Sequence, residues 1–281
     1  MKLRQFDALG QTTILDRSRA ANAVLKKWRP MAAIAVALLV VSTTAVAQRG
    51  GPPQPPPTAR ASAPFDITGY WVAIVSEDWR YRMTTAPKGD YAGVPLNQAG
   101  RQAADAWDPA KDETAGEQCR AYGAAGLMRM PGRLHITWQG EQVLQIEADA
   151  GSQTRTLRFE PATGGSAVGW QGTSSAIWDR SESIMARGGF FPGPALRGGS
   201  LKAVTSGMRA GYLRRNGVPY SAGAVLTEYF DRFDVPGADS LLVVQSEVVD
   251  PTYLATPFWT STHFRKQVDA SGWNPRPCSA R

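Results

Sequence analysis

Short segments in which apolar and polar residues alternate recur along most of this 281-residue chain. Two of the clearest are residues 133–139, RLHITWQ, and residues 142–148, QVLQIEA. Because successive side chains of a strand point to opposite faces of a sheet, this period of two predicts β-strands with one buried face. Further predicted strands cover residues 69–76, 79–85, 126–130, 152–159, 173–179, 201–206, 223–233, 240–249 and 257–267.

The register of the first two segments follows from their apolar pattern. If an odd loop joins them, Ile136 faces Ile146, and the apolar side chains of both strands share one face. The other face then pairs His135 with Glu147. An even loop would mix apolar and charged residues on both faces, so the pattern favours a hairpin with an odd loop.

Helical patterns are confined to residues 96–107 and 109–119, between the second and third predicted strands. About ten strands in a meander leave two architectures, a closed up-and-down barrel and an open sandwich. Closure is favoured because an open sheet would expose two unpaired edges. We therefore predict an all-β fold, an up-and-down lipocalin-like β-barrel with one or two short helices inserted after the second strand.

The beginning of the chain has the order of parts of a signal peptide. A basic segment ending at Arg29 precedes an apolar run from Met31, which closes on Ala-Val-Ala at Ala47. Residues 1–47 therefore predict export to the periplasm or beyond, with no stable membrane span after cleavage. An uncleaved signal anchor is the alternative, because the segment before the apolar run is long.

Proline dominates the next segment, residues 48–64, which offers almost no large apolar side chain. We expect a Pro-rich linker there, either flexible or polyproline-like, since prolines remove backbone donors and such a segment cannot pack a core. Residues 65–281 then form one β-barrel domain, which is an ordinary length for a single domain.

Charge argues against a nucleic-acid partner. The whole chain carries 31 basic and 24 acidic residues, of which the first 47 residues hold seven and two. Subtraction leaves 24 basic and 22 acidic residues, a net charge of +2 for the remainder. The basic character therefore belongs mostly to the export segment, and no polyanion partner is expected.

Two cysteines, Cys119 and Cys278, are present. In an oxidising compartment they predict one disulfide, with two free thiols or half of a metal site as alternatives. No metal is expected, because neither cysteine has a CxxC partner and only two histidines occur. No cofactor is expected either, since the sequence lacks a Walker loop and a dinucleotide fingerprint.

The segment Gly69-Tyr70-Trp71 resembles the Gly-x-Trp that opens the barrel of lipocalin-like (calycin) proteins. That resemblance implies a tryptophan at the barrel floor with a basic residue of the last strand, Arg265 or Lys266, lying across it. More widely, segments such as FDITGYWV, AGEQCRAYG and VLTEYFDRF resemble a family of uncharacterised secreted proteobacterial proteins. This likeness implies export and a barrel, and it transfers no catalytic residue.

Several polar side chains are candidates for ligand binding at one cavity or its mouth. His135 and His263 are the only imidazoles, and a carboxylate beside a histidine suits a general base. Glu228 is expected inside the barrel, where an arginine such as Arg80, Arg82 or Arg129 would have to meet its charge. The alternative is that these side chains are structural or face solvent. The predicted ligand-binding set is Arg82, Arg129, His135, Tyr220, Glu228 and His263.

Tyr220 closes a loop, residues 208–221, that combines three arginines and two tyrosines between two strands. Such a loop can cap a barrel mouth and hold an anionic or aromatic ligand, or it can be a plain surface connection. We therefore expect a periplasmic or secreted barrel that binds a small, largely apolar or aromatic molecule. The alternatives are a cofactor-independent hydratase, isomerase or lyase in the same cavity, and an envelope interaction module.

The export segment generates the first testable prediction. The exported protein should begin near Gln48, because a signal peptidase requires the small residues that end at Ala47. Intact-mass analysis of the exported species should show the loss of residues 1–47. A full-length product retained in the membrane would contradict the prediction.

Overall fold

The computed structural model describes residues 55–161, 169–179, 199–237 and 239–280. The predicted signal segment and residues 48–54 of the predicted linker lie outside these ranges. The described residues from Pro57 onward belong to one compact unit. Within the described ranges, every helix is too short or too polar to span a bilayer.

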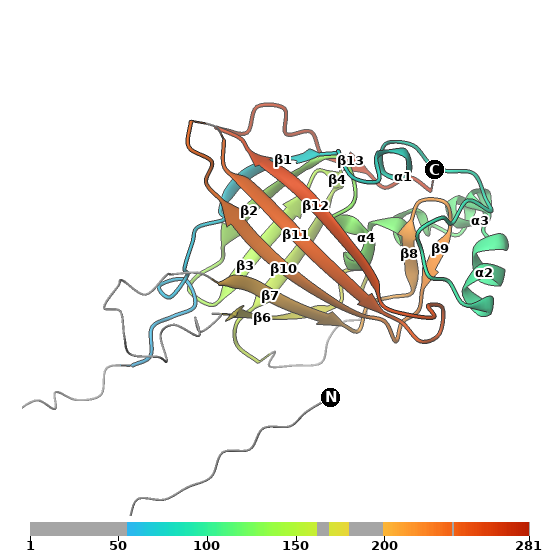
Figure 1. Ribbon diagram of the computed structural model, residues 1–281, viewed down its shortest axis with the longest axis horizontal. Helices are drawn as coiled ribbons and strands as arrows, with labels where there is room; N and C mark the ends of the chain where they lie inside the picture. Colours follow the sequence, from blue (N-terminus) through green and yellow to red (C-terminus); the bar gives the residue numbers. More distant parts are fainter. Residues whose placement is uncertain (1–54, 162–168, 180–198, 238, 281) are drawn as a thin grey trace, which may run out of the picture. The chain divides into compact units, whose positions relative to one another are not determined.

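A sheet of nine strands closes into a barrel (Figure 1). The order around the ring is β1-β12-β11-β10-β7-β6-β5-β3-β2. The predicted all-β barrel is therefore confirmed. Its strands are β1 (Gly69–Ile74), β2 (Arg133–Trp138), β3 (Val143–Ala148), β5 (Gln153–Arg158), β6 (Thr173–Asp179), β7 (Ser200–Ser206), β10 (Val225–Phe233), β11 (Leu241–Val249) and β12 (Phe258–Lys266).

One pair of neighbours in the ring is parallel. Strands β5 and β6 pair in parallel over only two positions, Leu157 with Ser174 and Arg158 with Ser175, whereas every other pair is antiparallel. A ring in which directions alternate closes only with an even number of strands, so nine strands require one parallel pair. The up-and-down meander is thus interrupted once, between β5 and β6.

The predicted register of the β2–β3 hairpin is confirmed. His135 pairs with Glu147, and Ile136 pairs with Ile146. Both isoleucines are fully buried, whereas the His135 and Glu147 side chains remain partly exposed. The alternation in the sequence therefore identified the inward face of this part of the barrel correctly.

The expected cation lies over the barrel tryptophan. Trp71 is fully buried, and its Nε1 donates to Ile67 O at 2.8 Å. The Lys266 Nζ lies 4.6 Å from the centroid of the Trp71 ring. This contact joins the first strand of the ring to the last and is of the cation–π kind.

Five short helical segments lie between β1 and β2, and a small hairpin follows β7. In Figure 1, α2, α3 and this hairpin lie together at one end of the barrel. We call this group, with η1 and α4, the cap. The helices are α1 (Trp79–Met83), α2 (Gln98–Asp105), α3 (Pro109–Thr114), the 3-10 helix η1 (Gln118–Tyr122) and α4 (Ala124–Leu127), and the hairpin is β8 (Gly211–Arg214) with β9 (Val218–Tyr220).

Two strand predictions were wrong, so the helical insertion follows the first strand directly. Residues 79–85 contain α1, which exposes Trp79 and Met83 and buries Arg82. The alternation of aromatic and polar residues in this segment therefore does not correspond to a strand with one buried face. Residues 126–130 are buried at every position and include the end of α4, and a short run buried on all sides carries no periodicity.

The end of the predicted linker belongs to the folded unit. Arg60 N donates to Glu141 O at 3.1 Å, and Trp178 Nε1 donates to Ala59 O at 2.7 Å. These bonds attach the chain to the β2–β3 turn and to β6. The expectation of a flexible linker up to residue 64 is therefore corrected for its last residues.

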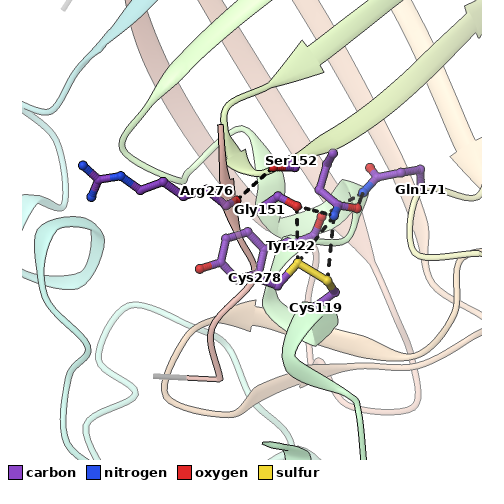
Figure 2. Close-up of a disulfide and its surroundings, with 8 residues drawn as sticks. Cys119, Tyr122, Gly151, Ser152, Gln171, Arg276 and Cys278 are labelled. Carbon is purple, nitrogen blue, oxygen red and sulfur yellow. Dashed lines mark hydrogen bonds between the residues drawn. A yellow bond between two sulfur atoms is a disulfide. The ribbon is translucent and has the colours of Figure 1, made fainter. Parts of the chain in front are cut away.

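The predicted disulfide between Cys119 and Cys278 is present (Figure 2). It joins η1 to the C-terminal tail, where β13 (Arg276–Pro277) pairs in parallel with β4 (Ala150–Gly151). Arg276 N donates to Asp149 O at 2.8 Å, and Ser152 Oγ donates to Arg276 O at 3.1 Å. The tail is thus held by a covalent bond and by a short sheet.

Removing the disulfide should lower the free energy of unfolding. It links residues 159 positions apart, and closing a loop of that size is worth up to about 5 kcal/mol in the chain-entropy model. Urea unfolding of the Cys119→Ser/Cys278→Ser double variant measures the effect, with reduced wild-type protein as the matched comparison. If the free energy of unfolding falls by less than about 1 kcal/mol in both the double variant and the reduced wild-type protein, the disulfide does not have the predicted stabilising role.

Candidate functional site

A cleft of about 350 Å³ opens in the cap, between the helices α2 and α3, η1 and the β8–β9 hairpin. Side-chain caps fix where the two helices of its wall, α2 and α3, begin. Asn97 Oδ1 accepts from Gly100 N at 2.9 Å at the start of α2, and Asp108 Oδ1 accepts from Ala110 N at 3.1 Å at the start of α3. Pro109 occupies the first turn of α3, where its missing N–H has no helical partner to lose. We refer to this hollow as the cap cleft.

Aromatic and charged side chains share the walls of the cap cleft. Arg120 and Tyr212 both bind Asp112: Arg120 Nη1 lies 3.0 Å from Asp112 Oδ1, and the Tyr212 hydroxyl donates to Oδ2 at 2.8 Å. The Arg120 guanidinium also lies 4.5 Å from the centroid of the Tyr212 ring. Both oxygens of Asp112 are therefore occupied, and the direction of Arg120 is fixed. The aromatic and charged lining residues are Trp107, Tyr212, Tyr220, Tyr253, Asp108, Lys111, Asp112 and Arg120.

Tyr220 reaches the cap cleft from β9 and is 1% exposed. Its hydroxyl lies against the backbone of Gly123 and Gly211, where an added Cβ would approach within 2.1 and 2.7 Å. Only glycine leaves room for the ring in this position. Burial raises the pKa of Tyr220, although the Arg120 and Arg155 guanidiniums oppose the rise, so the phenol stays protonated at neutral pH.

Three hydrogen-bond groups of the cap cleft residues have no partner among the described residues. They are the Tyr220 hydroxyl, Trp107 Nε1 and Arg120 Nε, and all three are buried. A buried polar group left without a partner costs about 1–3 kcal/mol. Three of the residues that line the cap cleft thus carry such a group, and all three groups are closed to solvent in this structure.

Glu228 lies inside the barrel, as expected, but its partner is Arg155. The Arg155 Nη2 and Nη1 atoms lie 2.6 and 3.1 Å from the two carboxylate oxygens, and both side chains are fully buried. Arg155 Nη2 also donates to Thr205 Oγ1 at 3.3 Å. The prediction that Arg80, Arg82 or Arg129 would meet the charge of Glu228 is therefore wrong.

A signal for Arg155 was present in the sequence. The residue lies opposite Ile146 in the register and shares the inward face of β5 with Leu157. Continuing the hairpin register by one strand would have placed it inside the barrel. Because charged side chains are rarely buried, the sequence pattern alone did not assign Arg155 to the inward face.

Arg82 and Arg129 belong to a buried network beside α1. Arg82 Nε donates to Arg129 O at 2.9 Å, and Arg82 forms an ion pair with Glu77. Arg129 Nη2 lies 2.7 Å from Asp78 Oδ2. Burial lowers the pKa of Arg82, and Glu77 opposes this shift. Both arginines thus bind neighbouring protein groups, although the buried Arg82 Nη2 has no partner among the described residues.

The two histidines lie on the outer wall of the barrel. His263 Nδ1 lies 3.0 Å from Glu77 Oε2, which connects it to the same network as Arg82. His135 Nδ1 lies 2.8 Å from Glu147 Oε2, and its ring stacks on Tyr70 with centroids 4.2 Å apart. The imidazoles are therefore separated from the cap cleft.

The six predicted residues do not surround one cavity. Arg82, Arg129 and His263 share the network beside α1, while His135 lies elsewhere on the outer wall. Glu228 lies in the barrel interior, and Tyr220 alone lines the cap cleft. The expected convergence is therefore corrected. Strand alternation explains why the His263 side chain faces outward: its neighbours Thr262 and Phe264 are buried and take the inward positions.

Sequence reasoning missed Arg120, Asp112 and Trp107. Tyr212 and Asp112 are 100 residues apart in the chain, and no local pattern predicts their hydrogen bond. The loop 208–221 was identified as a possible cap, and its hairpin does form one wall of the cleft. Within the described ranges, no group of three or more His, Cys, Asp or Glu residues could hold a metal ion.

No family model, no curated protein and no solved structure matches this chain.

Replacing Glu228 with Gln should destabilise the barrel. The buried Arg155 charge would lose its counter-charge, and breaking a buried pair in this way costs about 3–5 kcal/mol. Urea unfolding measures the change, with Glu247→Gln on the partly exposed face of β11 as the matched control.

The double variant Arg155→Met/Glu228→Leu should recover most of the lost stability, because it removes both charges while keeping the volume filled. A single Glu228→Gln variant within about 1 kcal/mol of wild type would show that the pair does not hold a desolvated charge.

Proposed function

We propose that this protein is an exported binding protein that holds a small molecule in the cap cleft. The ligand has a flat, largely apolar or aromatic body and at least one oxygen-rich anionic group. The observation that carries the proposal is an aromatic hollow whose lining residues Tyr220, Trp107 and Arg120 each carry a buried donor group without a partner among the described residues.

The chemistry of the unpartnered groups determines the polar end of the ligand. An indole N–H and a guanidinium N–H donate only, and a protonated phenol donates readily. A ligand that satisfies them must bring acceptors, and a carboxylate bound by arginine forms the stronger, charge-assisted kind of bond. The rings of Trp107, Tyr212 and Tyr253 favour a flat apolar body at the other end.

The barrel interior is a less favourable place for the ligand. Trp71, Phe230 and Phe264 project into it and are at most 1% exposed. Their rings, with the Arg155–Glu228 pair, occupy space that an open lipocalin-like cavity would leave for a ligand. The cap cleft of about 350 Å³ is within the usual size range of small-molecule sites, roughly 300–1,000 Å³.

Binding is favoured over acid–base catalysis in this cleft. Burial and the hydrogen bond to Asp112 raise the pKa of Tyr212, and burial raises that of Tyr220, so neither phenol is a base at neutral pH. Asp112 is occupied at both oxygens. Among the residues that line the cleft there is no histidine or cysteine.

Export is supported by two independent features. The signal-like segment predicts it, and the Cys119–Cys278 disulfide is of a kind that persists in oxidising compartments. The proposal therefore places the protein in the periplasm or outside the cell.

Tyr220→Phe separates a role in binding from a role in stability. The hydroxyl has no partner in the part of the chain that the structure describes, so its removal should leave the free energy of unfolding within about 0.5 kcal/mol of wild type or raise it. Affinity for 2-naphthoate, used as the probe in isothermal titration calorimetry, should fall about five- to tenfold because a ligand hydrogen bond is lost. Tyr229→Phe, on the outer wall, is the control and should change neither quantity.

The anionic group is tested with a matched pair of probes. Arg120→Gln should weaken 2-naphthoate about tenfold or more and leave the neutral 2-naphthamide almost unaffected. The proposal fails if wild-type protein binds neither probe, or if Tyr220→Phe and Arg120→Gln bind 2-naphthoate as wild type does.

A further inference from the structure

A second hollow, of about 400 Å³, lies under the C-terminal tail and is distinct from the cap cleft. Three arginines from separate parts of the fold line it: Arg133 at the start of β2, Arg215 in the β8–β9 turn and Arg276 in β13. Among the described residues that line it, Asp149 is the only acidic one, so this lining carries three positive charges against one negative, a net +2. We call it the tail cleft.

The three guanidiniums have no carboxylate partner among the described residues. Asp149 is buried, and its Oδ1 accepts from the Arg133 backbone N at 2.7 Å rather than from a side chain. Arg215 Nη2 donates to a carbonyl, Arg82 O, at 2.9 Å. The described lining therefore has an excess of positive charge, which favours the entry of an anion.

Each guanidinium is held in position while keeping donors free. That of Arg133 packs on Gly272, where an added Cβ would lie 2.6 Å from Nη2, and its buried Nε has no partner in the described chain. The Asn274 amide, oriented with its oxygen toward Arg276, accepts from Nε and Nη2 at 3.2 Å each. A guanidinium has five N–H donors, so each of the three arginines retains several for a ligand.

The tail supplies one wall of the tail cleft, and the disulfide holds the tail. Figure 2 shows Arg276 two residues before Cys278, beside the Ser152 hydroxyl that binds its carbonyl. The Cys119–Cys278 bond and the β13–β4 pairing therefore fix Arg276 relative to Arg133. Without the disulfide and this pairing, the C-terminal tail, which carries Arg276, could move away from the other two arginines.

We propose that the tail cleft binds a compact phosphate-type dianion and that this binding depends on the intact disulfide. The N–H groups of planar guanidiniums can bind two phosphate oxygens at once. The charge of three guanidiniums is balanced better by a dianionic ligand than by a ligand with a single carboxylate. This site lies beyond the cap cleft and does not depend on the ligand proposed there. A free phosphate ion and the phosphate group of a small monoester share this chemistry.

The test is isothermal titration of the oxidised protein with inorganic phosphate at constant ionic strength. Arg133→Gln and Arg276→Gln should each weaken phosphate about tenfold or more, as expected for the loss of a charge-assisted contact. Arg158→Gln, at an exposed position of β5, is the matched control and should bind as wild type does. The proposal is overturned if wild-type protein does not bind phosphate, or if the control loses as much affinity as the cleft variants.

Further arms identify the source of the anion and the role of the tail. Tighter binding of glycerol 1-phosphate than of inorganic phosphate indicates a monoester, and equal binding indicates the free ion; both outcomes support the site. Reduction of the disulfide should weaken phosphate about tenfold, with circular dichroism confirming that the barrel stays folded. Unchanged affinity after reduction would overturn the dependence on the disulfide.

Because reduction also lowers the stability of the whole domain, the Arg276→Gln variant, which keeps the disulfide, decides whether the tail contributes to binding. Arg276→Gln should keep its affinity for 2-naphthoate, and Arg120→Gln should keep its affinity for phosphate. A loss of phosphate binding in Arg120→Gln equal to that in Arg276→Gln would overturn the separate tail cleft. Failure of the cap cleft would appear only in the 2-naphthoate titrations.

Discussion

In a ring of nine strands, antiparallel pairing cannot continue all the way round. The structure resolves this with a parallel contact of two residue pairs between β5 and β6. Closure leaves the nine strands without a free edge, which removes the main route to edge-to-edge association. It also brings the first strand beside the last, where Lys266 covers Trp71. The position of every inward-facing side chain depends on this closed ring.

The interior of the closed ring contains polar groups as well as apolar ones. Arg155 and Glu228 are both fully buried, and each is tolerable only because the other is present. Thr205 and Ser174 extend the pair through hydroxyl hydrogen bonds of 3.3 and 2.7 Å. This polar group lies within electrostatic reach of Tyr220, which connects the interior to the wall of the cap cleft.

The cap and the tail create two clefts of different character at the same end of the barrel, where β1 ends and β2 begins. The cap cleft is aromatic, and its two acidic side chains offset Lys111 and Arg120. The tail cleft has no such balance, since its described lining contains three arginines and one carboxylate. One element, η1, contributes to both, since Arg120 lines the first and Tyr122 the second. Cys119, in the same short helix, anchors the tail that closes the second cleft.

The sequence alone determined where several strands lie and which face of a strand each side chain takes. Alternation in residues 133–148 specified the strands, their register and the outward direction of His135, because side chains of a strand point to opposite faces in turn. The disulfide followed from there being only two cysteines. Alternation failed at residues 79–85, where a helix buries an arginine and exposes a tryptophan.

Only the tertiary structure decided which distant segments meet. It set the parallel contact between β5 and β6, chose Arg155 as the partner of Glu228 and brought Asp112 to Tyr212 across 100 residues. It also dispersed the six predicted residues, leaving Tyr220 alone at the cap cleft. The physical reason is that local patterning fixes the face on which a side chain lies, whereas its neighbours on that face depend on how the whole ring closes and packs.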